Sequence, residues 1–82
     1  MTKDLIFEKL QAIIADEADM EKEEITADSR LVNDIGLTSV EILNATAEIE
    51  KTFSVRISEK MLRAFVIVQD IVNCIDNLLE GK

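Results

Sequence analysis

The stretch TSVEILNATAEIEKTF, residues 38–53, carries the clearest structural signal in this chain of 82 residues. Two of its residues, Thr38 and Glu41, have the S/T-x-x-E spacing of a capping box, in which the two side chains bind otherwise free amides at a helix start. Apolar side chains then recur at helical spacing to the end of the stretch. The stretch therefore predicts a helix that begins at Thr38 and runs to about Lys51 or Phe53.

Three more segments have helical patterns. Residues 3–17 and roughly residues 68–80 carry apolar side chains at helical spacing, and Ser58 can cap a short helix over residues 59–64. The alternating segment FSVRIS, residues 53–58, reads like a strand but has no second strand to pair with, so we expect a loop there. The sequence thus predicts an all-α fold, a small bundle of three longer helices and one short helix.

A long connection separates the first two predicted helices. Its length of about twenty residues is unusual for a compact domain, and such loops are often functional. We expect four apolar side chains near its end to anchor it to the core, namely Leu31, Val32, Ile35 and Leu37. The chain has no internal repeat and no low-complexity segment, so we expect one domain over residues 1–82.

The charge of the chain narrows the choice of partners. Seventeen acidic against nine basic residues give a formal net charge of −8. This charge disfavours binding to nucleic acid or to an anionic membrane surface, and it favours protein partners with basic patches. No apolar segment is long enough to span a bilayer, and the first residues do not resemble a signal peptide. We expect a cytoplasmic monomer that does not insert into membranes.

Catalytic and metal-binding residues are not evident. The chain has no His, which excludes a Ser-His-Asp set, and the lone Cys74 lies inside the apolar pattern of the last helix, where a free Cys is usually a small buried hydrophobe. A calcium loop counted from Asp28 would need oxygen ligands at Arg30 and Val32 and a final glutamate at Ser39. We therefore expect neither an enzyme nor a metal site.

Ser39 has two interpretations. It can belong simply to the capping chemistry of a helix start, which is common. Alternatively it can carry a phosphate ester, because the free amides and positive dipole end of a helix N-terminus suit a phosphodiester. Since the chain has no base to activate a serine, a separate enzyme would have to attach such a group. These residues alone leave both interpretations open.

At this point the chain resembles the acyl carrier protein family. The modified serine of that family usually lies in a Gly-x-Asp-Ser-Leu motif, and residues 36–40 read Gly-Leu-Thr-Ser-Val. The resemblance continues through the preceding loop EEITADSRLVNDIG (residues 23–36), the helix end ATAEIEKTFSVRIS (residues 45–58) and the closing helix FVIVQDIVNCI (residues 65–75). It therefore covers nearly the whole chain rather than one short motif.

The resemblance implies that Ser39 receives 4′-phosphopantetheine from coenzyme A through a phosphopantetheinyl transferase. The terminal thiol of this arm would hold acyl groups as thioesters and deliver them between the enzymes of fatty-acid or polyketide-like synthesis. Two alternatives remain open here. One is a carrier for amino acids or other acids that an adenylating enzyme loads, and the other is an unmodified helical interaction module of the same fold.

Partner-docking residues and an acyl pocket follow from the same resemblance. The docking candidates are Thr38, Val40, Glu41, Glu48 and Glu50. Each acid among them, taken singly, also fits a solvated helix face, and Asn44 and Lys51 replace two of the family's partner-facing acids. The residues that would enclose an acyl chain are Ile42, Ile49, Ile57, Leu62 and Phe65, of which the bulky Leu62 and Phe65 would narrow the pocket. Thr38 stands where the family usually has Asp, which puts recognition by a given transferase in question.

Overall fold

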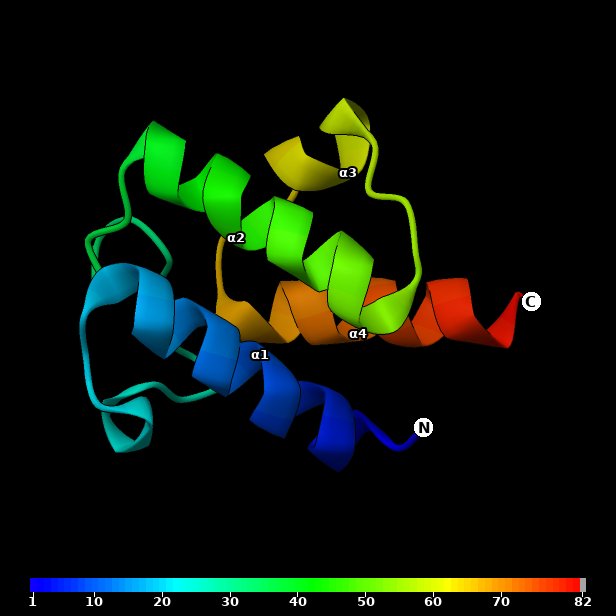
Figure 1. The fold of residues 1–82 in the computed structure, drawn as a ribbon, viewed down its shortest axis with the longest axis horizontal. Helices are drawn as coiled ribbons and strands as arrows, with labels where there is room; N and C mark the ends of the chain where they lie inside the picture. The colour runs from blue at the N-terminus through cyan, green and yellow to red at the C-terminus, as the bar shows by residue number, and fades with distance from the viewer. Residues whose placement is uncertain (82) are drawn as a thin grey trace.

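The structure, a computed structural model that describes residues 1–81, is a bundle of helices (Figure 1). The elements in chain order are α1 (Lys3–Ala18), the 3₁₀ helix η1 (Lys22–Glu24), α2 (Ser39–Phe53), α3 (Glu59–Arg63) and α4 (Val68–Glu80). The described residues form no strand, and residues 55–58 are a loop as expected. The predicted all-α fold and its four α-helices are confirmed, whereas η1 was not predicted.

The core lies where α1 meets α2 and α4. Because each of these helices repeats apolar residues at helical spacing, each turns one continuous apolar face inward. No polar or charged residue is buried with them among residues 1–81. The buried helical residues are Ile6, Leu10, Ile14 and Ala15 of α1, Ala45, Ile49 and Phe53 of α2, and Val68, Ile71, Val72 and Ile75 of α4.

Two apolar rows run along α2, and the structure buries only one of them. Ile49 and its neighbours in the core row are almost inaccessible, whereas Val40 is 65 % and Leu43 59 % exposed. A helix packed on one side covers a single stripe, so the second row stays on the surface. This exposed row, Val40, Leu43 and Ala47, lies on the turns that follow the helix start.

The long connection is anchored by three buried side chains, Ile25, Leu31 and Leu37, and Ile35 is partly buried against the same core. The predicted anchor Val32 is wrong, because its side chain is 59 % exposed. Val32 follows Leu31 directly in a turn, where two adjacent side chains point in different directions and only one of them reaches the core. Neighbouring apolar residues of this connection can therefore differ completely in burial.

The same connection is hydrogen-bonded to the start of α4. The Leu31 amide donates to the Val66 carbonyl oxygen at 3.0 Å, and the Val68 amide donates to the Ser29 carbonyl oxygen at 3.1 Å. An isolated antiparallel bridge lies between these two bonds. Local patterns in the sequence do not indicate this pairing, because the two segments are far apart in the chain.

Candidate functional site

The start of α2 is closed by the capping box that the sequence predicts. The Glu41 amide donates to Thr38 Oγ1 at 3.2 Å, and the Thr38 amide donates to Glu41 Oε1 at 2.9 Å. Two amides that a helix start normally leaves without a partner are thereby satisfied. The side chain of Thr38 is therefore used by the fold, and the residue after it is the first residue of the helix.

Ser39 is that first helical residue, and it is exposed. Its hydroxyl has no hydrogen-bond partner among residues 1–81. Leu37, two residues earlier, is only 5 % exposed and holds the chain to the core, while Gly36 takes a left-handed φ of 81° that side chains rarely adopt. The loop thus ends in a fixed geometry that presents Ser39 Oγ to solvent.

The three predicted docking acids of α2 have different surroundings. Glu41 belongs to the capping box, and Glu50 Oε2 accepts a hydrogen bond from the Ile57 amide at 2.8 Å. Glu48 is exposed and makes no hydrogen bond or ion pair within the part of the chain that the structure describes. Of the three, only Glu48 has a carboxylate with no partner among the described residues, so both of its oxygens can contact another molecule.

A groove of about 700 Å³ runs between α1 and α2 on the side of Glu48. We call it the α1–α2 groove, and it is lined by Ala12, Ile13, Asp16, Glu17, Asn44, Ala47 and Glu48. Inside it, Asn44 Nδ2 donates to Glu17 Oε1 at 3.1 Å. Sequence reasoning missed Asp16 and Glu17 as site residues, because only the packing of the two helices brings them beside Glu48.

Four of the five predicted acyl-pocket residues line one small cavity. Ile42, Ile49, Leu62 and Phe65 surround it, and its volume of about 20 Å³ is near that of a single water site. Its remaining walls, which the sequence did not indicate, are Ile14, Leu31, Leu37, Ala45, Thr46 and Ile71. These residues come from α1, the long connection, α2 and α4, so the sequence of any one segment does not reveal the cavity.

Ile57 does not lie at this cavity. It lines a separate open groove with Glu50, Val55, Arg56 and Met61. Ile57 lies in the loop after α2, where its amide is tied to Glu50, and its half-buried side chain lines a groove that shares no residue with the cavity. The family resemblance and its apolar side chain had grouped Ile57 with the other pocket candidates.

Cys74 is less buried than the sequence suggests. It is half-buried and lines an open groove of about 380 Å³ between α3 and α4, together with Met61, Phe65 and Leu78. Partial burial raises the pKa of the thiol, so the protonated form is favoured at neutral pH. A protonated thiol is a weak nucleophile, which disfavours a catalytic role.

A metal site and a membrane-spanning helix are both absent from the described residues. Residues 1–81 hold no group of three or more His, Cys, Asp or Glu side chains arranged to bind a metal ion. None of their helices combines the length and the apolar character that crossing a membrane requires. The start of α2 and its surroundings therefore remain the candidate site.

Comparison with known proteins identifies the family. Residues 8–75 match the family model described as "Phosphopantetheine attachment site". The acyl carrier protein of Onion yellows phytoplasma is 43 % identical over 68 residues, which are 83 % of this chain and 90 % of the relative. That of Coprothermobacter proteolyticus is 34 % identical over 82 residues and the full length of both chains. That of Borreliella burgdorferi is 37 % identical over 75 residues, 92 % of this chain and 94 % of the relative. This chain therefore belongs to the acyl carrier protein family and carries a covalently attached 4′-phosphopantetheine group.

Proposed function

We propose that Ser39 Oγ is the atom that carries the 4′-phosphopantetheine arm. The observation that supports this is the exposed hydroxyl at the first residue of α2, which has no hydrogen-bond partner among residues 1–81. A phosphodiester at this place is favoured by the positive end of the helix dipole. Because the hydroxyl takes no part in holding the fold, its esterification breaks no hydrogen bond of the described structure.

The transfer itself requires a second protein. A bond forms between Ser39 Oγ and the phosphorus next to pantetheine in coenzyme A, and the bond from that phosphorus to the bridging oxygen of the diphosphate breaks. The leaving group is adenosine 3′,5′-bisphosphate, and the serine proton must pass to a base. This chain has no His to act as that base, so a phosphopantetheinyl transferase supplies it.

The arm supplies a terminal thiol that holds acyl groups as thioesters. The chain's own residues position it: the capping box of Thr38 and Glu41 fixes the helix start, and buried Leu37 fixes the loop before it. The protein is then one carrier domain that delivers acyl groups between the enzymes of fatty-acid or polyketide-like synthesis and performs no catalysis itself. The names of the relatives favour this function over an aminoacyl carrier or an unmodified module.

The partner enzymes are expected to present basic patches to α2. Thr38 and Val40 lie exposed on either side of Ser39, and Glu41 and Glu48 follow on the same helix. A net charge of −8 would speed association with such patches and would keep copies of the chain apart as monomers. A cytoplasmic location is part of the same proposal.

We place the acyl-binding region at the small cavity of Ile42, Ile49, Leu62 and Phe65. Its lining is apolar, and the one hydroxyl there, that of Thr46, donates to the Ile42 carbonyl oxygen at 2.7 Å and so offers no free polar group. A cavity of about 20 Å³ has room for one water-sized group, so a longer acyl chain must displace side chains of the lining such as Leu62 and Phe65.

Modification in vitro tests the attachment atom. Incubation of the purified chain with coenzyme A and a broad-specificity phosphopantetheinyl transferase should add the mass of one arm, and peptide mapping should place it on Ser39. Ser39→Ala should remain helical and gain no mass. Ser58→Ala is the matched control, because it removes a serine at another helix start, where Ser58 Oγ accepts from the Met61 amide. The control should accept the arm as the parent does.

Two outcomes would contradict this assignment. An arm found on another residue would show that this residue, and not Ser39, is the attachment site. No arm with several transferases would leave the unmodified interaction module as the better description of this chain.

A further inference from the structure

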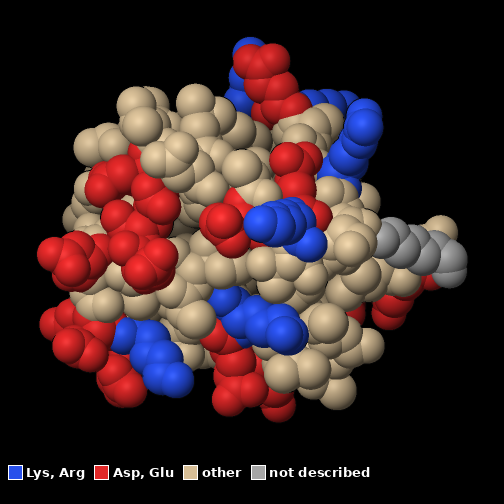
Figure 2. Space-filling model, viewed as in Figure 1, with Lys and Arg blue, Asp and Glu red and all other residues tan. Residues whose placement is uncertain are grey.

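Charge is distributed unevenly along this acidic chain. Residues 51–69 hold four Lys or Arg residues and one acid, whereas the rest of the chain holds five Lys or Arg residues and sixteen acids. Three of the four cations, Arg56, Lys60 and Arg63, lie on α3 or in the loop that leads into it, and all three are exposed. In Figure 2 the blue atoms of Lys and Arg gather at the upper right, over α3 and that loop, while red atoms dominate the left-hand side. The molecule therefore has a basic end.

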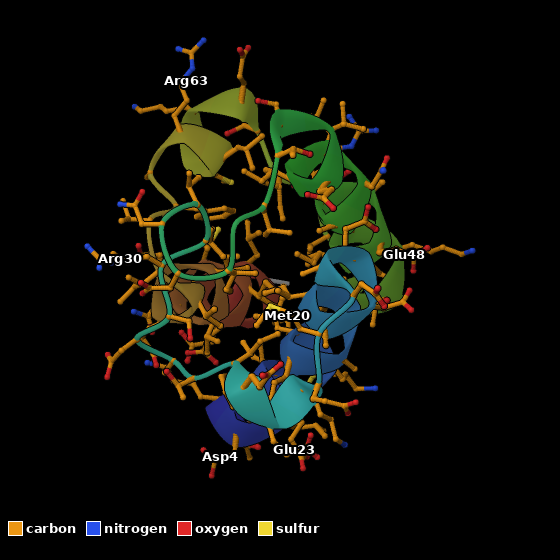
Figure 3. All side chains as sticks on the ribbon, turned by 90° about the vertical axis from the view of Figure 1, so that its left-hand side faces the viewer. Asp4, Met20, Glu23, Arg30, Glu48 and Arg63 are labelled. Carbon is orange, nitrogen blue, oxygen red and sulfur yellow. The ribbon has the colours of Figure 1, made fainter. Side chains whose placement is uncertain are left out.

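The cations at this end differ in whether the fold already pairs them. Figure 3 shows Arg63 pointing away from the molecule, at the end opposite Asp4. Its guanidinium donates to Glu59 at 2.8 Å, so the one acid of residues 51–69 is already paired. Arg56 and Lys60 make no hydrogen bond or ion pair within residues 1–81. Two exposed cations are thus free to pair with another molecule.

An open groove of about 730 Å³ lies beside these cations. Arg56 belongs to its lining, and its apolar lining residues are Val55, Ile57 and Met61. Val55 is buried, and the other two side chains are half-buried, so part of each remains open to a ligand. We call residues 55–63, which line this groove or carry its neighbouring cations, the α3 surface. This surface combines apolar area with free positive charge.

One acid also lines the groove. Glu50 comes from α2, and its Oε2 atom accepts a hydrogen bond from the Ile57 amide at 2.8 Å. Its negative charge repels any other carboxylate that comes close to α2. An anionic occupant is thereby directed away from α2 and toward Arg56 and Lys60. Glu50 therefore limits where in the groove an acid can bind.

We propose that the α3 surface binds an acidic segment of a partner protein. Apolar side chains of the segment lie against Ile57 and Met61, and its Asp or Glu side chains pair with Arg56 and Lys60. The charge of this occupant is opposite to that expected for a partner at the acids of α2. The proposal goes beyond the function of the arm, because none of these contacts involves Ser39.

Charge and extent separate this occupant from the others. A second copy of the chain brings a net charge of −8 and is repelled. Nucleic acid and anionic membranes are extended polyanions, so they would also meet the sixteen acids that lie outside residues 51–69. Salt screens charges over about 8 Å at physiological ionic strength, so a short segment responds mainly to the cations next to it. A short acidic segment therefore fits this surface best.

A designed peptide tests the surface directly. The probe has about 11 residues, three helical turns, with Leu along one face and Glu along the other. Its titration into the isotope-labelled full chain should shift the backbone amide signals of residues 55–63. A peptide with Lys in place of every Glu should leave these signals unchanged. The chain should bind equally with and without its arm, because Ser39 lies about 16 Å along α2 from Glu50.

Matched charge variants separate the α3 surface from the net charge. Arg56→Glu with Lys60→Glu should weaken binding of the Glu peptide about tenfold or more, since both changes replace an attraction by a repulsion. Lys9→Glu with Lys22→Glu changes the net charge equally, at exposed sites outside the α3 surface. This control should weaken binding less than about threefold, because its charges are screened from the peptide.

Single variants test the remaining walls of the groove. Glu50→Gln should strengthen binding about twofold or more, because it removes the like charge and keeps an acceptor for the Ile57 amide. Glu48→Gln, at an exposed acid of α2 outside this groove, should have a smaller effect. Met61→Gln should weaken binding without a charge change, whereas Leu43→Gln, at an exposed apolar residue of α2, should not.

Several results would overturn the proposal. Equal losses in the two paired charge variants would show that only the net charge matters. Shifts of residues 55–63 with the Lys peptide would show that the cations do not select the occupant, and concentration-dependent shifts without peptide would identify a second copy. Sedimentation of the parent, but not of Arg56→Glu with Lys60→Glu, with phosphatidylglycerol vesicles would identify a membrane surface instead. Far-UV circular dichroism of each variant excludes loss of the fold as the cause, and failure to modify Ser39 would leave these results unchanged.

Discussion

The two connections that flank α2 differ in how firmly the core holds them, and the longer one is the better anchored. The first, residues 19–38, buries the side chains of Ile25, Leu31 and Leu37. The second, residues 54–67, includes α3 but buries only Val55. In Figure 1, α3 lies apart from α1, at the edge of the bundle. The number of buried anchors, rather than the length of a connection, therefore decides how well it is fixed.

Side chains of neighbouring helices also hold each connection in place. Gln11 Nε2 of α1 donates to the carbonyl oxygens of Lys22 and Ile25, at 2.7 and 2.8 Å, and so ties down the first connection. Glu50 of α2 accepts from the Ile57 amide in the second. Elements with few buried apolar contacts unfold locally most easily, so we expect the second connection to open before the first. Leu62 and Phe65, which narrow the small cavity, are carried by that connection.

The largest expected effect comes from removing an anchor of the first connection. Leu31→Ala should cost about 2–5 kcal/mol of unfolding free energy, because Leu31 is 4 % exposed and its loss leaves a cavity. Leu62→Ala, the matched change in the second connection, should cost less, since Leu62 is only half-buried. Chemical denaturation measures both. Equal losses would show that the two connections are held equally.

Loss of the clamp on the second connection should have the next largest effect. Glu50→Ala leaves the part-buried Ile57 amide without its acceptor, which should cost about 1–3 kcal/mol. Glu50→Gln keeps an acceptor oxygen and should cost less. Hydrogen exchange at the Ile57 amide should speed up in Glu50→Ala while exchange at the Leu31 amide stays as in the parent. Faster exchange at both amides would mean that the connections are coupled.

The cap at the end of the first connection should contribute less. Thr38→Ala removes the acceptor for the Glu41 amide and should cost about 0.5–2 kcal/mol. Thr38→Asp keeps an acceptor and adds negative charge at the positive end of the helix dipole, so its stability should equal or slightly exceed that of the parent. It also restores the usual residue of the family, so modification of Ser39 should be faster. Denaturation and parallel modification rates check the two expectations separately.

The smallest effect should be the pH-dependent stability that Asp34 contributes to the first connection. Hydrogen bonds from the Arg30 backbone amide and from its side chain lower the pKa of the Asp34 carboxyl below its ordinary value of 3.8. A lowered pKa in the folded state stabilises the fold above the ordinary value, and this contribution is lost as the pH falls through the lowered pKa.

Asp34→Asn tests this contribution. The stability difference between the parent and the variant should be present near neutral pH and should shrink as the pH falls below about 3.8. Glu59→Gln is the control, because it breaks the exposed Arg63 pair on α3 and leaves the first connection untouched. A difference that grows on acidification would contradict the assigned direction of the Asp34 shift.

Much of the fold follows from local patterns in the sequence. The four α-helices, the capping box of Thr38 and Glu41 and the loop over residues 55–58 depend on side chains within a few positions of one another. The assignment of Val32 as an anchor was wrong, because the turn sets the direction of its side chain. The apolar character of a residue does not specify that direction. Ile57, which the family resemblance groups with the pocket residues, lines the groove beside Glu50.

By itself, the sequence determined the four α-helices, the place of Ser39 at the start of the second and the resemblance to a family of carriers, because each rests on neighbouring residues. Tertiary packing decided which apolar row of α2 is buried, which left Val40 and Leu43 on the surface. It also brought Asp16 and Glu17 beside Glu48 and left a cavity of only about 20 Å³ under α2. These features depend on the separation and rotation of helices that are distant in the chain, and helical periodicity is the same for every such arrangement.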